Sequence, residues 1–357
     1  MMFYFKKDHK SLTLFMVITL IMALALAGCS SSSNSSNSGN AATAVDGGEK
    51  KADPIIVKFS HVTTIDSPKG LASEKFKELA EKYTDGRVTV EVYPSSQLYG
   101  DKEELEAVQA GNVHIIAPSI TKLVGMNPQF QYVDLPFLFK DNEAVYKFWE
   151  SDANKKLMNS LDNYGVRLLA MWPNGFKQFV NGKYPLVTPA DFKGLKFRVQ
   201  AGSVLEAQFK ALGAGSATIP FGETYTALQQ GTVDATENTF NNIDTQKYAE
   251  VQKHLTVSNH GRLDYCIIVN TKFWDGLPGD IREALEKAMA EATDYAVELA
   301  EDLDQKSFEN LKNAGMEVVE LNEVQRAEFV KVMEPVVAEF ESVIGKDIID
   351  AARAANQ

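Results

Sequence analysis

Cysteine is nearly absent from this chain, since only Cys29 and Cys266 occur among its 357 residues. Cys29 ends an N-terminal apolar run, whereas Cys266 lies inside the apolar stretch LDYCIIVN. Cys266 has no partner for an intrachain disulfide, and we expect it to be a buried structural thiol. Hydrophobic burial must therefore hold the fold together, and about 300 residues after the N-terminal segments suffice for two domains.

Positive charge is also in short supply. The chain has 36 Lys and Arg against 48 Asp and Glu, for a formal net charge of −12. Proteins that bind nucleic acid do so through basic patches, so this balance argues against a nucleic-acid partner. If the chain binds an anion, its overall field opposes the approach, and the site must supply local cations.

Recognisable catalytic and metal-binding motifs are missing. The histidines His9, His61, His114, His254 and His260 form no HExxH pattern and have no neighbours at metal-ligand spacing. No GxSxG, phosphate-loop or GxGxxG motif occurs, and the glycine-rich stretch 213–217 lacks the lysine of a phosphate loop. We therefore predict no enzymatic activity, no cofactor and no metal. The acidic pair Glu103 and Glu104 is expected to be solvated.

The first 28 residues are typical of a bacterial lipoprotein signal peptide. Lys6, Lys7 and Lys10 precede an apolar run from Leu12 to Ala27, which ends in LAGC. This ending resembles the lipoprotein box, whose cysteine, here Cys29, is acylated after cleavage. The alternative is a transmembrane anchor with a chance cysteine. Residues 29–53, rich in Ser, Asn and Gly, predict a flexible linker with a reach of roughly 25–30 Å.

From residue 54 onward, strand-like and helix-like segments alternate, which predicts an α/β fold with a mostly parallel sheet. The strands are expected at 55–60, 88–93 and 166–172, and the helices at 67–84 and near 142–163. A long helix is predicted at 279–312, followed by a strand at 315–321 and helical residues at 322–355. Residues 105–119 also resemble residues 225–239. If this echo is not chance, the chain has two similar halves with a ligand cleft between them.

Several polar residues stand where such a cleft would be. In KGLKFRVQ, residues 193–200, apolar and polar residues alternate, so Arg198 lies on the polar face of a predicted strand. That face is either solvated or lines an anion site. Lys69 opens a predicted helix, where a cation is unfavourable to the helix dipole, which favours a role toward an anionic ligand. Residues 234–242 bring amides together, which form a turn or orient a small polar ligand.

Several segments resemble the solute-binding proteins of TRAP transporters, closest to the DctP-type, C4-dicarboxylate-binding branch. They are 191–214, 233–278, FSHVTTIDSPKG and WPNGFKQF, within a resemblance that covers roughly 54–340. The resemblance implies a two-domain, periplasmic-binding-protein-like (type II) fold with a hinge, a central cleft and a long helix crossing both domains. We expect domain I at 54–177 plus about 264–310, and domain II at 178–263 plus about 311–357.

The resemblance also implies the site. Arg198 falls on the family arginine that binds a carboxylate, Lys69 on the lysine near a second carboxylate, and Asn238 on an amide that hydrogen-bonds the ligand. Further expected cleft residues are Trp172, Asn174, Phe221, Phe240, Asn242 and His61. Ala235, the small QAGS segment and the lack of proline after Asn238 depart from the family pattern and put the exact ligand in doubt.

The function that follows from the resemblance is reversible binding of a small organic acid outside the cytoplasmic membrane. A C4-dicarboxylate such as succinate, fumarate or malate would be bound by domain closure and delivered to the small and large membrane subunits of a TRAP permease. The protein would be a monomer, anchored through Cys29 on the outer face or in the periplasm. The alternatives are another carboxylate (a keto, sugar or aromatic acid), a sensory module for a membrane kinase, or an extracellular enzyme.

Overall fold

The computed structural model describes residues 53–357, which belong to one unit of the chain. The predicted signal peptide, Cys29 and all but the last residue of the predicted linker lie outside the described residues. The strands are β1 (Ile55–Ser60), β2 (Val88–Tyr93), β3 (Ile115–Ile116), β4 (Val166–Asn181), β5 (Lys196–Val199), β6 (Gly215–Thr218), β7 (Ala235–Asn238), β8 (His254–Asn270) and β9 (Glu317–Glu320).

Helices cover the sheet and connect its strands. The α-helices are α1 (Pro68–Tyr83), α2 (Glu104–Ala110), α3 (Asn142–Trp149), α4 (Asp152–Asn159), α5 (Ser203–Ala211), α6 (Thr224–Gln229), α7 (Phe240–Thr245), α8 (Thr271–Asp275), α9 (Gly279–Asn313), α10 (Glu323–Ile344) and α11 (Lys346–Ala355). Short 3-10 helices are η1 (Ile120–Gly125), η2 (Pro128–Asp134), η3 (Ser160–Tyr164), η4 (Pro189–Phe192), η5 (Phe221–Glu223) and η6 (Tyr248–Glu250).

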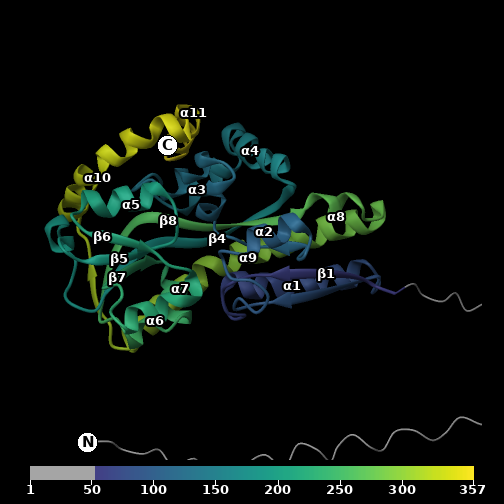
Figure 1. Cartoon of the computed structure of the whole chain (residues 1–357), viewed down its shortest axis with the longest axis horizontal. Coiled ribbons are helices and arrows are strands. Elements are labelled where there is room, and N and C mark those ends of the chain that lie inside the picture. The colour runs from purple at the N-terminus through teal and green to yellow at the C-terminus, as the bar shows by residue number, and fades with distance from the viewer. Residues whose placement is uncertain (1–52) are drawn as a thin grey trace, which may run out of the picture. The chain divides into compact units, whose positions relative to one another are not determined.

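One mixed sheet runs through the described part of the chain, in the order β2-β1-β3-β8-β4-β7-β5-β6, with β9 beside β8. Its two flanks are parallel, because β1 pairs in parallel with β2 and β3, and β5 with β6 and β7. The long central strands β4 and β8 are antiparallel to each other. The α/β prediction is confirmed, but the sheet is mixed where a mostly parallel one was expected. The reason is the long β4–β8 ladder, which joins the flanks (Figure 1).

The internal echo is visible in the structure. In the first flank (β1, β2, β3 with α1 and α2), helix α2 stops at Gly111 with φ of 78°. In the second flank (β5, β6, β7 with α5, α6 and α7), α6 is followed by Gly231 with φ of 68°. This left-handed backbone is easily adopted only by glycine. Read inward from each edge, the strand orders β2-β1-β3 and β6-β5-β7 correspond, so each flank contains the same three-strand unit.

Helix α9 confirms the predicted long helix and packs against both flanks. Its 35 residues span about 52 Å at 1.5 Å per residue. It packs on α1 in the first flank and on α7 in the second, and it also lies along β4. Its apolar face follows helical spacing and includes Ile281, Leu285, Ala288, Ala292 and Ala296. The helix therefore ties the flanks together.

Two predicted helices are broken in the structure. The one expected near 142–163 divides into α3, α4 and η3, because Ser151 has extended backbone angles and its side chain caps α4 at Asn154. The helical stretch 322–355 breaks at Gly345, whose φ of 99° no helix can contain. The C-terminal helices pack in a shared cluster with residues of η2, α3 and α4. The predicted division into domains I and II stays a prediction.

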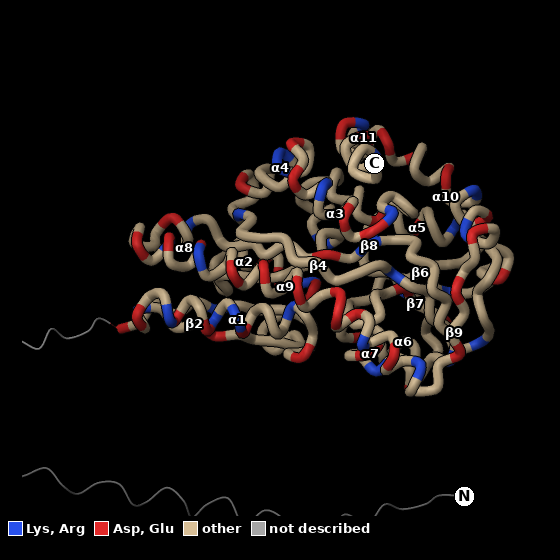
Figure 2. Tube along the Cα trace, turned by 180° about the vertical axis from the view of Figure 1, so that it is seen from behind, with Lys and Arg blue, Asp and Glu red and all other residues tan. Residues whose placement is uncertain are grey.

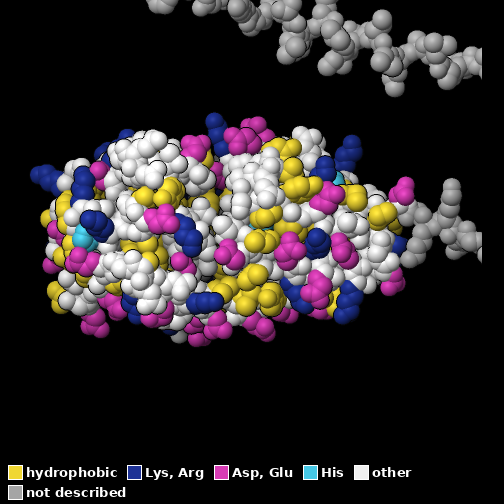
Figure 3. All heavy atoms as spheres, turned by 90° about the horizontal axis from the view of Figure 1, so that it is seen from below, with side chains coloured by type: hydrophobic (Ala, Val, Ile, Leu, Met, Phe, Trp, Pro, Cys, Tyr) yellow, Lys and Arg dark blue, Asp and Glu magenta, His cyan; other side chains and the backbone are white. Residues whose placement is uncertain are grey.

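The burial of Cys266 and the mixture of charges on the surface agree with the composition. Cys266 is fully buried, as expected. Charged residues are spread over both flanks, and the face seen in Figure 3 mixes acidic and basic side chains (Figures 2 and 3). Among the described helices, none combines the length and the apolar character needed to cross a bilayer.

Candidate functional site

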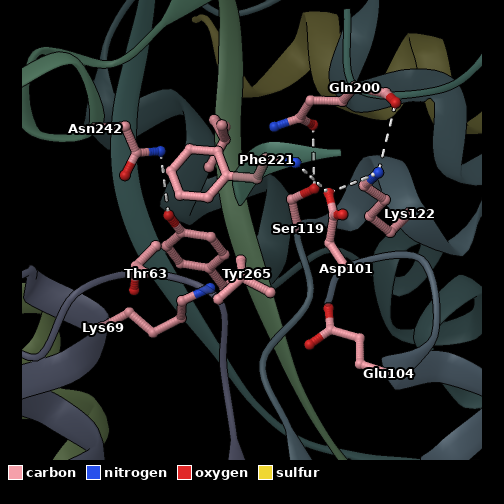
Figure 4. Close-up of a pocket in the computed structure, with 12 residues that line it drawn as sticks. Thr63, Lys69, Asp101, Glu104, Ser119, Lys122, Gln200, Phe221, Asn242 and Tyr265 are labelled. Carbon is pink, nitrogen blue, oxygen red and sulfur yellow. Dashed lines mark hydrogen bonds and ion pairs between the residues drawn. The ribbon is translucent and has the colours of Figure 1, made fainter. Parts of the chain in front are cut away.

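A pocket lies between the two flanks, with β8 as its floor (Figure 4). The start of α1, the start of α2 and η1 line it from one side, and the end of β5, η5 and α7 from the other. It encloses about 300 Å³ of space, counting its open mouth. Its lining residues are Val62, Thr63, Lys69, Asp101, Glu104, Ser119, Lys122, Gln200, Phe221, Asn242, Leu263 and Tyr265.

Lys69 is buried in this pocket because of how α1 begins. Ser67 caps the helix and Pro68 takes its first position, so Lys69 is placed in the first turn. Its Nζ donates a hydrogen bond to the Ala117 carbonyl oxygen at 2.8 Å and lies 3.7 Å from the centre of the Tyr265 ring. Within residues 53–357 it makes no salt bridge. Burial lowers the pKa of Lys69 to about 8, although nearby carboxylates act to raise it.

Arg198 lies on β5 and is completely buried, although Lys196, two residues earlier on the same face of the strand, is exposed to solvent. Its Nε donates to the Ile219 carbonyl oxygen at 2.9 Å. Its Nη1 and Nη2 have no hydrogen-bond partner among the described residues. Burial lowers the pKa of Arg198, opposed by Tyr248, Asp101 and Glu237. Arg198 is not itself a lining residue, but its strand continues to Gln200, which is.

The predicted amides form one network around the hydroxyl of Tyr265. Asn174 Nδ2 donates to this hydroxyl at 3.0 Å, and Asn242 Nδ2 donates to Asn238 Oδ1 at 2.8 Å. Three amide atoms remain without a partner in the described part of the chain: Asn174 Oδ1, Asn238 Nδ2 and Asn242 Oδ1. Buried amide groups are normally all paired. The network therefore has two acceptors and one donor left to offer.

The other predicted residues have different surroundings. Phe221 lines the pocket, whereas Trp172 lies in the core beside Phe59 and donates its Nε1 to Thr293. Phe240 packs on Phe308. His61 is buried between Thr63 and Ser73, and burial, aided by Lys69, lowers its pKa to about 3, so its ring is neutral. The structure thus brings Lys69, Phe221 and Asn242 to the pocket itself.

Sequence reasoning missed the acidic side of the pocket. Asp101 forms a buried salt bridge with Lys122 at 2.9 Å and accepts a hydrogen bond from the Phe221 backbone N–H at 3.2 Å, across the two flanks. Glu104, which was expected to be solvated, is buried, and that expectation is wrong. The echo offered a signal for Asp101, because Gly100-Asp101 corresponds to Gly222-Glu223 in the second unit. Lys122 and Tyr265 carried no such signal, whereas Gln200 lies on the same alternating face of residues 193–200 as Arg198.

Further contacts connect the flanks at the rim of the pocket. Ser119 Oγ donates to Gln200 Oε1 at 3.1 Å, and Lys122 Nζ approaches the Gln200 carbonyl oxygen at 3.5 Å (Figure 4). Gln131 Oε1 accepts hydrogen bonds from the Ser203 backbone and hydroxyl groups at 3.1 and 2.7 Å. The flanks therefore touch through polar groups that water could also satisfy. Within residues 53–357, no group of three or more His, Cys, Asp or Glu could hold a metal ion.

Comparison with known proteins agrees with this geometry. Residues 59–343 match the DctP family, described as bacterial extracellular solute-binding protein, family 7. The C4-dicarboxylate-binding periplasmic protein DctP of Rhodobacter capsulatus is 52% identical over 306 residues, which are 85% of this chain and 92% of that protein.

Two solved structures have the same fold. A TRAP periplasmic solute-binding protein from Shewanella oneidensis, with bound succinate, has a TM-score of 0.84 and 42% identity, and the match covers 85% of this chain and all of that one. A TRAP solute-binding protein from Pseudomonas aeruginosa, with bound L-malate, has a TM-score of 0.78 and 42% identity, over 80% of this chain and all of that one. This chain therefore belongs to family 7 of the bacterial extracellular solute-binding proteins, the DctP family of TRAP transporters.

Proposed function

We propose that this chain binds a C4-dicarboxylate between its two flanks, with succinate, fumarate and malate as the candidate ligands. The observation that carries the proposal is Arg198, a buried guanidinium whose Nη1 and Nη2 lack partners among residues 53–357. Leaving charged hydrogen-bond donors buried and unpaired is costly. A carboxylate satisfies both in the two-pronged geometry that arginine favours.

The second carboxylate would meet Lys69. Lys69 and Arg198 come from opposite flanks, and neither forms a salt bridge within the described residues. The third cation near the pocket, Lys122, is half-buried and already paired with Asp101. Two unpaired cations match two carboxylates in number. The bound succinate and L-malate in the two related structures support the same ligand class.

A longer or more hydroxylated acid is the alternative ligand. The unpaired amide atoms of Asn174, Asn238 and Asn242 could hydrogen-bond the hydroxyl groups of a sugar acid. Lys69 favours the dicarboxylate, since an acid with one carboxylate would leave this buried ammonium without an anion. The alternative of a sensory module has no contact in the structure that favours it.

The test is calorimetric titration of succinate, fumarate and malate into the purified protein, after unfolding and refolding to remove any bound acid. We expect micromolar or tighter binding by the wild type. Arg198→Ala should lose about 2–5 kcal/mol of binding free energy, because the ligand carboxylate then loses its buried partner. This corresponds to an affinity loss of about 30-fold or more.

Matched controls separate the binding role from a general charge effect. Arg198→Lys keeps the charge but not the planar fork, so it should bind more weakly than the wild type and more tightly than Arg198→Ala. Arg87→Ala removes an exposed arginine paired with Asp280 and should leave affinity unchanged. No heat with any of the three acids, or undiminished binding by Arg198→Ala, would contradict the dicarboxylate assignment.

We further propose that the protein acts as a lipid-anchored monomer that delivers its ligand to the small and large TRAP membrane subunits. The LAGC sequence that ends at Cys29 supports the anchor. The family supports a transport function without catalysis. Cys29→Ser should shift the protein from the membrane fraction to the soluble fraction of cells, as detected by immunoblot. If the variant remains in the membrane fraction, the anchor lies elsewhere.

A further inference from the structure

Glu104 is a buried carboxyl group that the proposed ligand contacts do not use. It lines the pocket and is fully buried, and neither Oε1 nor Oε2 has a hydrogen-bond partner among the described residues. Figure 4 shows its carboxyl group below that of Asp101, turned toward the side of the pocket that carries Lys69. An unpaired carboxylate in such a place is costly unless it gains a partner or a proton.

Helix α2 fixes this position. Glu104, Ala107 and Val108 share its buried face, as the spacing of three and four residues requires. The neighbouring Glu103 is one position earlier and exposed to solvent. The two glutamates therefore provide a matched pair, one inside the pocket and one outside.

The cations around the pocket are too few to give Glu104 a partner of opposite charge once a dianion is bound. Lys122 is paired with Asp101, so Lys69 and Arg198 remain for an incoming dianion. If Glu104 were ionised, the complex would bury one negative charge without a matching cation. Like charges in a buried site disfavour ionisation of one of them.

The surroundings of Glu104 act in the same direction before any ligand arrives. Burial raises the pKa of Glu104 to about 8, and Asp101 and Glu103 add to this, whereas Lys69 and Lys122 oppose it. A carboxylic acid that is neutral near pH 7 can donate a hydrogen bond, which an ionised one cannot do.

We propose that Glu104 is protonated in the complex and donates its O–H to one carboxylate of the bound dicarboxylate, so that a neutral carboxyl group holds one end of the acid. The proton comes from solvent and stays on Glu104, and no other bond is made or broken. An O–H donor to a carboxylate forms a short, charge-assisted hydrogen bond. This inference rests on the proposed function, because it requires an ionised carboxylate in the pocket.

The first experiment is infrared spectroscopy of the succinate complex at pH 7, compared with the complex of Glu104→Gln. We expect the wild-type complex to show the C=O stretch of a protonated carboxylic acid. The band should be absent in Glu104→Gln and should not move when the succinate carboxyls carry ¹³C. A band that moves with the label would place the proton on the ligand and overturn the proposal, as would the absence of any band.

Affinities at pH 7 give a second, independent measurement. Glu104→Ala removes the donor and should weaken succinate binding about tenfold or more. Glu104→Gln keeps a neutral N–H donor of similar shape and should bind more tightly than Glu104→Ala. Equal losses in both variants would mean that an ionised carboxylate is needed, which contradicts the proposal.

The control and the outcomes separate the two proposals. Glu103→Gln should keep both the wild-type affinity and the infrared band, and circular dichroism should show that all variants are folded. If succinate binds but the band is absent, the protonation of Glu104 is refuted and the dicarboxylate function stands. If the wild type binds none of the dicarboxylates, the proposed function fails, and the role of Glu104 fails with it.

Discussion

At the scale of single residues, the two candidate cations differ in the contacts that they already make within the protein. Arg198 has one hydrogen bond, through Nε, and two nitrogens left without a partner among residues 53–357. Lys69 has a carbonyl acceptor in Ala117 and an aromatic ring in Tyr265. Because its ammonium is partly satisfied without an anion, Lys69 should contribute less to binding than Arg198.

Lys69→Met tests this difference. It should weaken succinate binding by about tenfold, since the second carboxylate of the ligand loses its buried ammonium partner. Binding of propionate, which has a single carboxylate, should change much less. Titration calorimetry with both acids measures the ratio, and Lys75→Met, on the outer part of α1, should change neither. An equal loss for both acids would assign Lys69 to the same carboxylate as Arg198.

Part of this site could be predicted from the sequence, and the prediction was incomplete for a physical reason. Strand alternation placed Arg198 on a polar face, and an unfavourable position at a helix start pointed to Lys69. The burial of Glu104 could not be predicted, because in a helix of seven residues the buried face depends on what packs against it. The cross-flank contact of Asp101 with Phe221 is also non-local and leaves no spacing pattern.

At the scale of elements, local signals fixed the ends of many helices and strands. The helix predicted at 67–84 is α1, which Ser67 caps and Pro68 begins, and β1 and β2 have the predicted bounds. The length of β4 and its antiparallel pairing were not predictable in the same way. The strand extends to Asn181, well beyond the predicted end at 172. Both its length and its direction are set by the ladder with β8, a partner far along the chain.

The first turn of α1 depends on a glycine. A Cβ at Gly70 would lie 2.4 Å from the carbonyl oxygens of both Thr64 and Ile65, which are backbone atoms that cannot easily move. Gly70→Ala should therefore destabilise the protein by roughly 1–3 kcal/mol and displace Lys69, weakening succinate binding. Urea unfolding and calorimetry measure the two effects. Gly279→Ala, at an open position on α9, is the control and should be near neutral.

A buried ion cluster joins β4, β7 and β8. Lys177 Nζ contacts Glu237 at 2.8 Å and Asp134 at 3.1 Å, and His260 Nε2 lies 2.7 Å from Glu237. Although burial acts to raise it, Lys177 and His260 lower the pKa of Glu237 to about 2. Burial raises the pKa of Asp134 to about 6, against the effect of Lys177. Ionisation of Asp134 therefore lowers the stability of the folded state, whereas ionisation of Glu237 increases it.

The pH dependence of stability follows from Glu237. Its pKa is lower in the folded state than the usual 4.5, so its stabilisation is present above about pH 4.5 and is lost as the pH falls toward 2. The loss should reach about 3 kcal/mol of unfolding free energy. The Asp134 effect acts between about pH 4 and 6, so the measurement belongs below pH 4. In denaturant titrations, the stability difference between the wild type and Glu237→Gln should shrink toward pH 2; a constant difference would refute this.

At the scale of the whole molecule, β4, β8 and α9 pass through both flanks. Neither flank can unfold without breaking these shared elements, so we expect a single unfolding transition in both ellipticity and tryptophan fluorescence. Succinate at 100 times its dissociation constant should raise the unfolding free energy by about 2.7 kcal/mol. Two separate transitions, or stabilisation of only one of them, would show that the flanks unfold independently.

The repeated three-strand unit has a consequence for the ligand. Lys69 follows β1 and Arg198 lies on β5, and these are corresponding strands of the two units. The two halves of a duplicated architecture would thus each supply one cation to one end of the acid. Succinate has identical ends and can enter either way round with the same result. Malate has a hydroxyl group at one end only, and the difference between a lysine and an arginine then decides which way round it lies.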